Sequence, residues 1–228
     1  ATITIPTTPT FLRGLMLFKK STLAVAAFLA ATGSVYAAET SPVTANVTVV
    51  NDYVFRGISQ SNFKPAVQGG FDYTHEETGL YIGNWNSSIS WLSDGYGNSG
   101  YVPTKGKTGY ALSAPVEMDF YAGWKQEFFG KGFASDIGVI TYYYPNTGIP
   151  NTNGLYANPN TTEVYAAQNF TFGSLTGFAK ISYALSNIFG INNSSGSYYP
   201  DLTLNYDTGI WGLALNGHVG YQYVSKTQ

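Results

Sequence analysis

Few side chains of this sequence have the chemistry of a catalytic or metal site. The chain contains two histidines, His75 and His218, and no cysteine. It carries neither a Gly-x-Ser-x-Gly turn nor a His-Glu-x-x-His helix. His75 precedes two glutamates, which predicts a solvated, charged turn. His218 alternates with Asn216 and Gln222, which predicts a hydrogen-bonding role on a polar strand face. We therefore expect no enzyme, no cofactor and no metal.

The charged side chains of the alternating segments point to a different chemistry, that of a polar lumen. Acidic residues outnumber basic ones on these polar faces by nine to three. Low-dielectric walls would focus their field and attract cations. The same groups could instead form ion pairs that fill the interior and leave a narrow path. The candidate lumen-facing residues are Asp52, Arg56, Asp72, Glu117, Asp119, Lys125, Asp136, Glu163, Lys180 and His218.

The elements that must position these residues are short segments of period-two alternation separated by turn-forming clusters. No helical periodicity follows residue 44. Nine strands are predicted, over residues 45–58, 66–75, 80–91, 116–127, 133–144, 162–172, 175–185, 201–207 and 211–224. Successive strand residues face opposite sides, so each strand has one apolar and one polar face. For the first strand, the predicted apolar face holds Val47, Val49, Tyr53 and Phe55.

Two architectures produce this alternation. A soluble sandwich or lipocalin-like barrel turns the apolar face inward, whereas a membrane barrel turns it toward lipid. Three aromatic pairs ten residues apart favour the membrane barrel, because ten tilted strand residues span roughly 25 Å, the height of the apolar band between two aromatic girdles. The candidate girdle pairs are Tyr81 and Trp91, Phe133 and Tyr143, and Trp211 and Tyr221.

The connections between the strands alternate in length. The long ones cover residues 59–65, 92–115, 145–161 and 186–200, and the short ones cover 75–79, 128–132, 173–174 and 208–210. Transmembrane barrels combine long external loops with short periplasmic turns. The pattern therefore favours an up-and-down antiparallel transmembrane β-barrel with its amino terminus in the periplasm.

Composition excludes several classes of protein. Aromatic residues make up 16% of the chain, which is too many for a disordered segment. No apolar run is long enough for a transmembrane helix. Charged residues make up only 11%, against about 25% in soluble domains. These values suit strands that expose one face to lipid and the other to water.

Residues 1–37 have the features of upstream residues followed by a cleavable signal peptide. Arg13, Lys19 and Lys20 form a basic region, an apolar stretch follows at 23–31, and a small-x-small cleavage pattern ends at Ala37. Removal of this segment leaves eight basic residues against all 13 acidic ones, so the net charge changes from −2 to −5. No basic surface suited to nucleic acid remains. Residues 38–228 then form the barrel domain.

Nine is an odd number of strands, whereas bacterial single-chain barrels have an even number and no open edge in lipid. We therefore expect the barrel domain to be incomplete at its C-terminus.

Several segments resemble the TorF-type porin family of outer-membrane proteins. The most specific is Asn51-Asp52-Tyr53-Val54-Phe55-Arg56-Gly57-Ile58-Ser59-Gln60-Ser61. The likeness continues through residues 65–73, 79–85, 117–123, 136–140, 142–145 and 161–165. It implies an outer-membrane β-barrel of about twelve strands, exported by a signal peptide in a Gram-negative bacterium. Asn51 departs from the Ser or Thr expected before Asp-Tyr. The family name implies a porin by analogy and specifies no substrate.

These observations lead to one leading functional hypothesis. We expect an outer-membrane porin that gives small solutes passive, weakly cation-preferring passage, with the lipid bilayer as its surroundings and no nucleic-acid partner. The sequence indicates no oligomeric state. An alternative is a structural or adhesive surface barrel that binds an external partner through its long loops without a conducting pore. A secreted soluble β-sandwich is the third hypothesis.

Overall fold

The computed structural model describes residues 41–98, 114–145, 147 and 158–226. The expected signal peptide and most of the 92–115 connection lie outside these ranges. The main strands are β1 (Val43–Val50), β4 (Ala66–His75), β5 (Leu80–Ser88), β6 (Val116–Glu127), β7 (Phe133–Tyr143), β8 (Thr161–Phe172), β9 (Leu175–Ala184), β10 (Tyr198–Asp207) and β11 (Ala214–Gly220). One helix, α2 (Trp91–Asn98), follows β5, and two short strands, β2 (Val54–Phe55) and β3 (Ile58–Ser59), follow β1.

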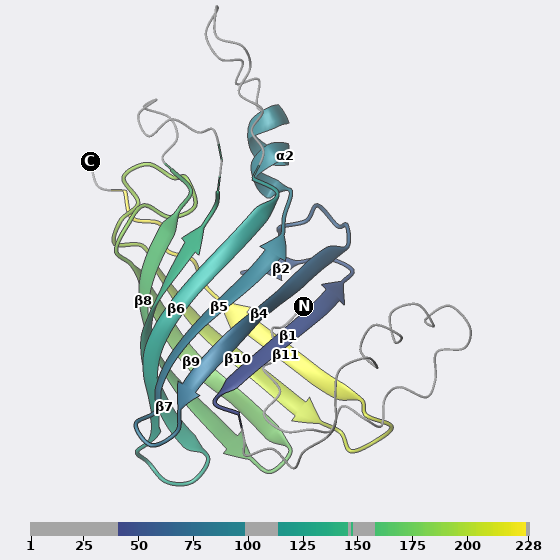
Figure 1. Cartoon of the computed structure of the whole chain (residues 1–228), viewed down its shortest axis with the longest axis vertical. Helices are drawn as coiled ribbons and strands as arrows, with labels where there is room; N and C mark the ends of the chain where they lie inside the picture. Colours follow the sequence, from purple (N-terminus) through teal and green to yellow (C-terminus); the bar gives the residue numbers. More distant parts are fainter. Residues whose placement is uncertain (1–40, 99–113, 146, 148–157, 227–228) are drawn as a thin grey trace, which may run out of the picture.

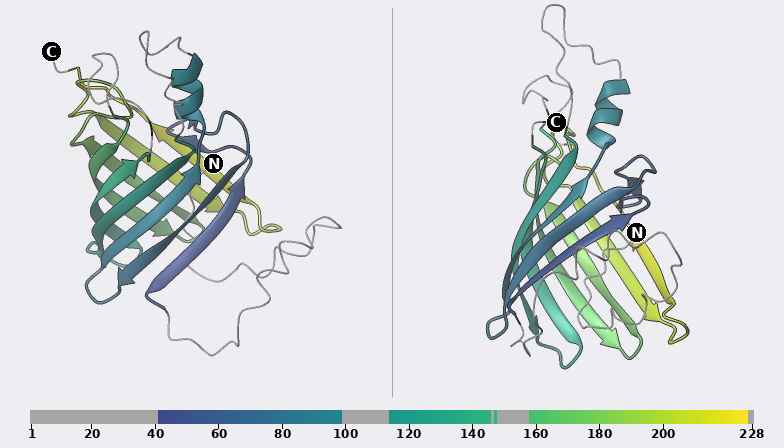
Figure 2. Two further views of the ribbon diagram at one scale, coloured as in Figure 1. Left: turned by 45° about the horizontal axis from the view of Figure 1, so that its top comes forward. Right: turned by 45° about the vertical axis from the view of Figure 1, so that its right-hand side comes forward.

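The nine main strands form one antiparallel sheet in the order β1-β4-β5-β6-β7-β8-β9-β10-β11. Each main strand pairs with the next one along the chain, so the sheet is an up-and-down meander. Figures 1 and 2 show that the sheet curls and brings its first and last strands to the same side of the molecule. The expected all-β, up-and-down antiparallel arrangement is confirmed. Its nine strands correspond one to one with the nine predicted segments.

The two ends of the sheet carry connections of different length, as the sequence predicts. At one end, residues 76–79, 128–132, 173–174 and 208–213 join successive strands. At the other, called here the upper end, residues 51–65, 89–115, 144–160 and 185–197 do so. The β2–β3 hairpin and α2 belong to this upper end, where Figure 1 shows α2 projecting from the sheet.

The two faces of the sheet have inverted exposure compared with a water-soluble fold. The convex face is apolar and open: Val47 is 74% exposed and Leu215 is 57% exposed. The concave face buries polar side chains in its central strands: Glu117 and Glu163 are each 2% exposed. Soluble proteins seldom bury unpaired charge or expose large contiguous apolar surfaces. Further convex-face residues are Val49, Val67, Phe71, Ile82, Phe120, Ile137, Val139, Val164, Ile181, Leu202, Leu204 and Val219.

The outer edges of the sheet are β1 and β11. Within the described residues β1 pairs only with β4, and β11 pairs only with β10. No second sheet of comparable size packs against the first one in this part of the chain, so the layered arrangement of a sandwich is not observed there. None of the helices among the described residues is long and apolar enough to cross a membrane.

The predicted first strand differs most from the structure. It was expected to run over residues 45–58, but β1 ends at Val50 and the chain turns inward. Tyr53 and Phe55 were expected on the apolar outer face, and this is wrong. Tyr53 is 3% exposed and belongs to a cluster of buried hydrophobic side chains, against which Phe55 packs. The other members of this cluster are Ala66, Ile89, Leu92, Ala114, Tyr142 and Tyr144. The reversal follows from the β2–β3 hairpin, which lies against the concave face.

Candidate functional site

The concave face brings together side chains from strands that are not neighbours. Tyr81 on β5 donates a hydrogen bond to Asp136 on β7, two strands away. Tyr121 on β6 likewise reaches Asp72 on β4, with 2.6 Å between the hydroxyl and carboxylate oxygens. Such contacts require a sheet that bends around these residues. The concave face is therefore an interior lined by carboxylates, tyrosines and a few cations.

A short hairpin closes the upper part of this interior. Val54 pairs with Ser59 and Phe55 with Ile58, which leaves Arg56 and Gly57 as a two-residue turn. Both turn residues have positive φ, 47° and 81°, as a type I′ turn requires. Glycine adopts this conformation readily, but for an arginine it is uncommon. Contacts of the Arg56 side chain with the interior must therefore hold the turn in this form.

Asp52 caps the base of the hairpin rather than facing the interior from a strand. Its Oδ1 accepts hydrogen bonds from the hydroxyls of Ser59 at 2.6 Å and Ser61 at 2.9 Å. The bond from Ser59 contributes most to lowering the pKa of Asp52, and the bond from Ser61 adds to this effect. The Ser61 hydroxyl also accepts from the backbone N–H of Tyr53. These bonds tie the two ends of the hairpin segment together.

Arg56 forms a two-pronged ion pair with Glu163 on β8. Nη2 lies 2.6 Å from Oε2 and Nη1 lies 3.0 Å from Oε1. A paired geometry of this kind is the strongest that the two groups can make. Nη1 also donates to Oε1 of Gln222 at 2.7 Å. Side-chain exposure is only 9% for Arg56 and 2% for Glu163, so the pair is desolvated.

Aromatic rings complete the surroundings of the guanidinium group. Its central carbon lies 4.3 Å from the ring centre of Tyr199, 4.9 Å from that of Phe55 and 5.7 Å from that of Phe189. Cations within about 6 Å of an aromatic face are attracted by the ring quadrupole. The carboxylate supplies charge and the rings exclude water. Together they form a cage around a planar cation.

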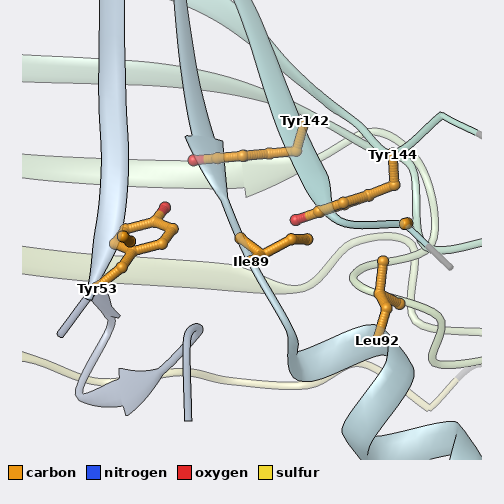
Figure 3. Close-up of a cluster of buried hydrophobic side chains, with 7 residues drawn as sticks. Tyr53, Ile89, Leu92, Tyr142 and Tyr144 are labelled. Atoms are coloured by element: carbon orange, nitrogen blue, oxygen red, sulfur yellow. The ribbon is translucent and has the colours of Figure 1, made fainter. Parts of the chain in front are cut away.

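A second buried carboxylate lies next to the hairpin on β6. Glu117 accepts hydrogen bonds from the hydroxyls of Tyr53 at 2.6 Å and Tyr144 at 2.5 Å, one on each oxygen. Burial, followed by the Glu117 charge, raises the pKa of Tyr53 well above its ordinary value. Tyr53 therefore stays protonated and donates. Figure 3 shows Tyr53 and Tyr144 with Tyr142, Ile89 and Leu92 at this end of the sheet.

Asp119, two residues further along β6, has no comparable partners. It is 5% exposed, and its Oδ1 makes no hydrogen bond. Asp119 lies opposite Tyr142 in the β6–β7 register, so it faces the same buried region as the hairpin. The upper interior therefore contains three buried carboxylates, of which one is neutralised by Arg56.

The middle of the concave face combines tyrosines with glycines. In three cross-strand pairs a tyrosine lies directly opposite a glycine: Tyr121 and Gly83, Tyr81 and Gly123, and Tyr165 and Gly138. A Cβ atom on any of these glycines would collide with the tyrosine side chain. Each tyrosine side chain therefore occupies the space that a Cβ atom of its glycine would fill, a known way to cover a glycine in a sheet. Tyr81 and Tyr165 also share a hydrogen bond between their hydroxyls.

The cations below the hairpin are Lys180 and, near the lower end, Lys125. The Lys180 ammonium lies 5.4 Å from the ring centre of Phe178 and 5.9 Å from that of Tyr165. Lys125 is exposed and lies opposite Asp136 in the strand register. On β11, His218 Nε2 lies 3.1 Å from Asp201 Oδ1. The described residues include no cluster of three or more groups suited to a metal ion.

Most of the predicted lumen residues do lie on the concave face. The structure places Asp72, Glu117, Asp119, Lys125, Asp136, Glu163, Lys180 and His218 on main strands with their side chains on that side. Asp52 and Arg56 differ, because β1 ends before them. Arg56 still reaches the interior, but from a hairpin turn, and Asp52 caps the segment that carries it.

The predicted girdle residues divide into two groups. Phe133 and Tyr143 occupy the two ends of β7 on the convex face, where Phe133 contacts Phe172. Trp211 is fully exposed in the turn before β11, and Tyr221 is 63% exposed just after it. These four residues lie at strand ends on the exposed side.

The Tyr81–Trp91 pair was expected on the outer face, and this is wrong. Tyr81 faces inward toward Asp136, and Trp91 begins α2 because β5 ends at Ser88. The error has a physical cause. The hairpin gives Trp85 an apolar partner inside, Tyr53, with 5.3 Å between ring centres. Asn84 and Asn86 take the outward positions, where they bond to each other and to nearby backbone carbonyls.

Sequence reasoning did not identify the hairpin or the inner tyrosines. A signal for the hairpin was present, since Gly57 sits in a two-residue turn between the β-prone pairs 54–55 and 58–59. The inner tyrosines also had a signal. Glycines 83, 123 and 138 fall at inward positions of β5, β6 and β7, and a large ring on the neighbouring strand can cover each of them.

The fold and site define a class: an all-β protein whose curved antiparallel meander has a polar, charged concave face and an apolar convex face. Residues 36–228 match the model of the Gcw_chp family, described as bacterial proteins of unknown function. Because this match covers most of the sequence, the chain belongs to the Gcw_chp family. Comparison with curated proteins and with solved structures finds no match. The family description states no activity.

Proposed function

We propose that this protein is an outer-membrane β-barrel that gives small solutes passive, weakly cation-preferring passage. The observation that carries the proposal is the inverted exposure of the sheet. Large apolar side chains cover the convex face, whereas Glu117, Asp119 and Glu163 lie buried on the concave one. Lipid is the solvent that suits such a convex face. The resemblance to TorF-type porins and the signal-peptide features of residues 1–37 support the same location.

The preference for cations rests on the balance of charge inside. Eight carboxylates lie at concave positions of the main strands: Asp72, Glu117, Asp119, Glu127, Asp136, Glu163, Asp201 and Asp207. Among the described residues, the cations that reach the same interior are Arg56, Lys125 and Lys180. Arg56 neutralises Glu163 directly, which leaves an excess of negative charge. A lumen with this excess should favour cations over anions.

Planar-bilayer recording tests the proposal with the full-length protein. We expect discrete conductance steps and a reversal potential in a salt gradient that shows modest preference for K⁺ over Cl⁻. The double variant Asp72→Asn/Asp136→Asn should reduce this preference. The matched control is Glu76→Gln, which removes a carboxylate from an exposed lower turn and should leave selectivity unchanged. Absence of current, or a clear preference for anions, would contradict the proposal.

A second candidate function is a structural or adhesive surface barrel without a conducting pore. The observation that favours it is the β2–β3 hairpin, which places Arg56 and the buried aromatic residues across the upper interior. In that case the long upper connections would bind an external partner. A liposome-swelling assay without permeability, together with surface binding that is lost when the 92–115 connection is shortened, would favour this function over a channel.

A further inference from the structure

Arg56 occupies a site that other parts of the chain build. Glu163 comes from β8, Tyr199 from β10, Phe189 from the 185–197 connection, and Gln222 follows β11. We call these four residues the Glu163 cage. They supply a carboxylate in fork geometry, two aromatic rings and an amide oxygen, all directed at one guanidinium group. This set of contacts is what a binding site for a free organic cation would contain.

The cage and its occupant differ in how firmly they are held. Glu163 lies in a twelve-residue strand that is paired on both sides, with β7 and with β9. Arg56 lies at the tip of a hairpin whose two strands form only two residue pairs, and its φ of 47° is uncommon for a residue other than glycine. An isolated two-stranded hairpin has little stability of its own. The tip therefore depends on the cage more than the cage depends on the tip.

The base of the hairpin is anchored separately. Tyr53 is bonded to Glu117 and to Ser61, and its carbonyl accepts from the N–H of Gln60 at 2.7 Å. None of these bonds involves Arg56, so they can persist when Arg56 leaves the cage. The buried carboxylate of Asp119 lies on the same concave face, and its Oδ1 has no hydrogen-bond partner.

We propose that the Glu163 cage is a binding site for the guanidinium or primary ammonium group of a small solute. In this structure Arg56 occupies it as a ligand supplied by the chain itself, which the solute must displace. The inference builds on the proposed channel function and specifies its solute class as small organic cations. A planar guanidinium should bind better than an ammonium, because only the former matches both carboxylate oxygens. A neutral isostere should not bind, since it would leave Glu163 buried without a counter-charge.

The test is a binding experiment with the full-length protein folded in detergent. The probes are N-butylguanidinium chloride and its neutral isostere N-butylurea. The variant Arg56→Ala empties the cage and should bind N-butylguanidinium at least about tenfold more tightly than the wild type does by calorimetry. The same probe should raise the melting temperature of Arg56→Ala and leave that of the wild type nearly unchanged. N-butylurea should neither bind to Arg56→Ala nor raise its melting temperature. The double variant Arg56→Ala/Glu163→Gln should bind neither probe.

Three results would overturn the inference. They are equal affinity of Arg56→Ala and wild type for N-butylguanidinium, equal affinity for the charged and neutral probes, and binding that survives Glu163→Gln. If Arg56→Ala does not fold alone, its refolding yield is measured with each probe. Recovery with N-butylguanidinium but not with N-butylurea supports the cage, and recovery with neither contradicts it.

The outcome can be separated from that of the channel proposal, because binding is measured without a membrane potential or current. Binding without conductance would support the binding-site proposal and contradict the channel proposal. Conductance without binding would support the channel proposal and contradict the binding-site proposal.

Discussion

The buried carboxylate of Glu117 makes the structure testable at the level of single hydroxyl groups. Tyr53→Phe removes one of its two donors and keeps the ring that packs against Trp85. A hydrogen bond to a charged group is worth about 1.5–3 kcal/mol. Glu117 is only 2% exposed, so water cannot readily replace the lost donor. We expect Tyr53→Phe to lower the free energy of unfolding by about 1.5–3 kcal/mol.

Removal of both donors should have a larger effect. In Tyr53→Phe/Tyr144→Phe neither oxygen of Glu117 retains its donor, so the loss should equal or exceed the sum of the two single losses. A triple variant that also carries Glu117→Met removes the acceptor and leaves an apolar group of similar size. Because replacing both partners of a buried bond can be nearly neutral, the triple variant should recover much of the stability lost in the double variant.

The assay is urea unfolding of the protein folded in lipid vesicles, monitored by tryptophan fluorescence. Free energies of unfolding are compared between variants whose m-values, the slopes of free energy against urea concentration, agree. The matched control is Tyr73→Phe, which removes a hydroxyl from the exposed convex face and should change stability by less than about 0.5 kcal/mol. A loss below about 0.5 kcal/mol for Tyr53→Phe, or no recovery in the triple variant, would refute the reasoning.

Three further predictions concern other parts of the sheet. Gly138→Ala should cost about 1–3 kcal/mol of stability by overpacking against Tyr165. The control Gly217→Ala, with nothing within 4 Å of the new Cβ, should be nearly neutral. Equal effects of the two variants in urea titrations would contradict the packing of tyrosine on glycine. Because hydrogen bonds, first from Ser59, lower the pKa of Asp52, its stabilisation is present above the unfolded-state pKa of about 3.9 and is lost as pH falls through the lower folded-state pKa. The urea midpoint of the wild type should therefore fall more steeply below about pH 4 than that of Asp52→Asn, and parallel curves would exclude this role. Val47→Arg should destabilise the vesicle-embedded protein by about 2–4 kcal/mol, while Asn46→Arg on the opposite face should cost much less, and similar losses would argue against a lipid-facing convex surface.

The strands were predictable from the sequence because alternation is a local property. The limits of β4 and β6 agree with prediction, and most other strand ends differ by no more than three residues. Turn-forming residues fixed these limits, since Gly173 and Gly79, with positive φ, occupy the tight lower connections. Which face is polar followed from the same period.

The hairpin was not predictable in the same way, because its position depends on tertiary contacts. Residues 52–56 continue the alternation of β1, so periodicity alone extends that strand. The chain turns inward because Glu117, Glu163 and Trp85 provide partners on strands far along the sequence. The predicted outward position of Tyr81 was wrong for a related reason. Its inward position depends on Gly123 and Asp136, which lie on other strands.

The ion pair of Arg56 also has a consequence for the order in which the chain acquires its structure. Arg56 is separated from Glu163 by 107 residues and from Gln222 by 166 residues. Contacts between such distant residues form late, because closing a long loop costs entropy before the contact gives any return. The segment around Arg56 emerges early in synthesis but cannot reach its final place until β8 and the residues after β11 have assembled. Its docking should therefore be a late folding step that reports whether the sheet has assembled correctly.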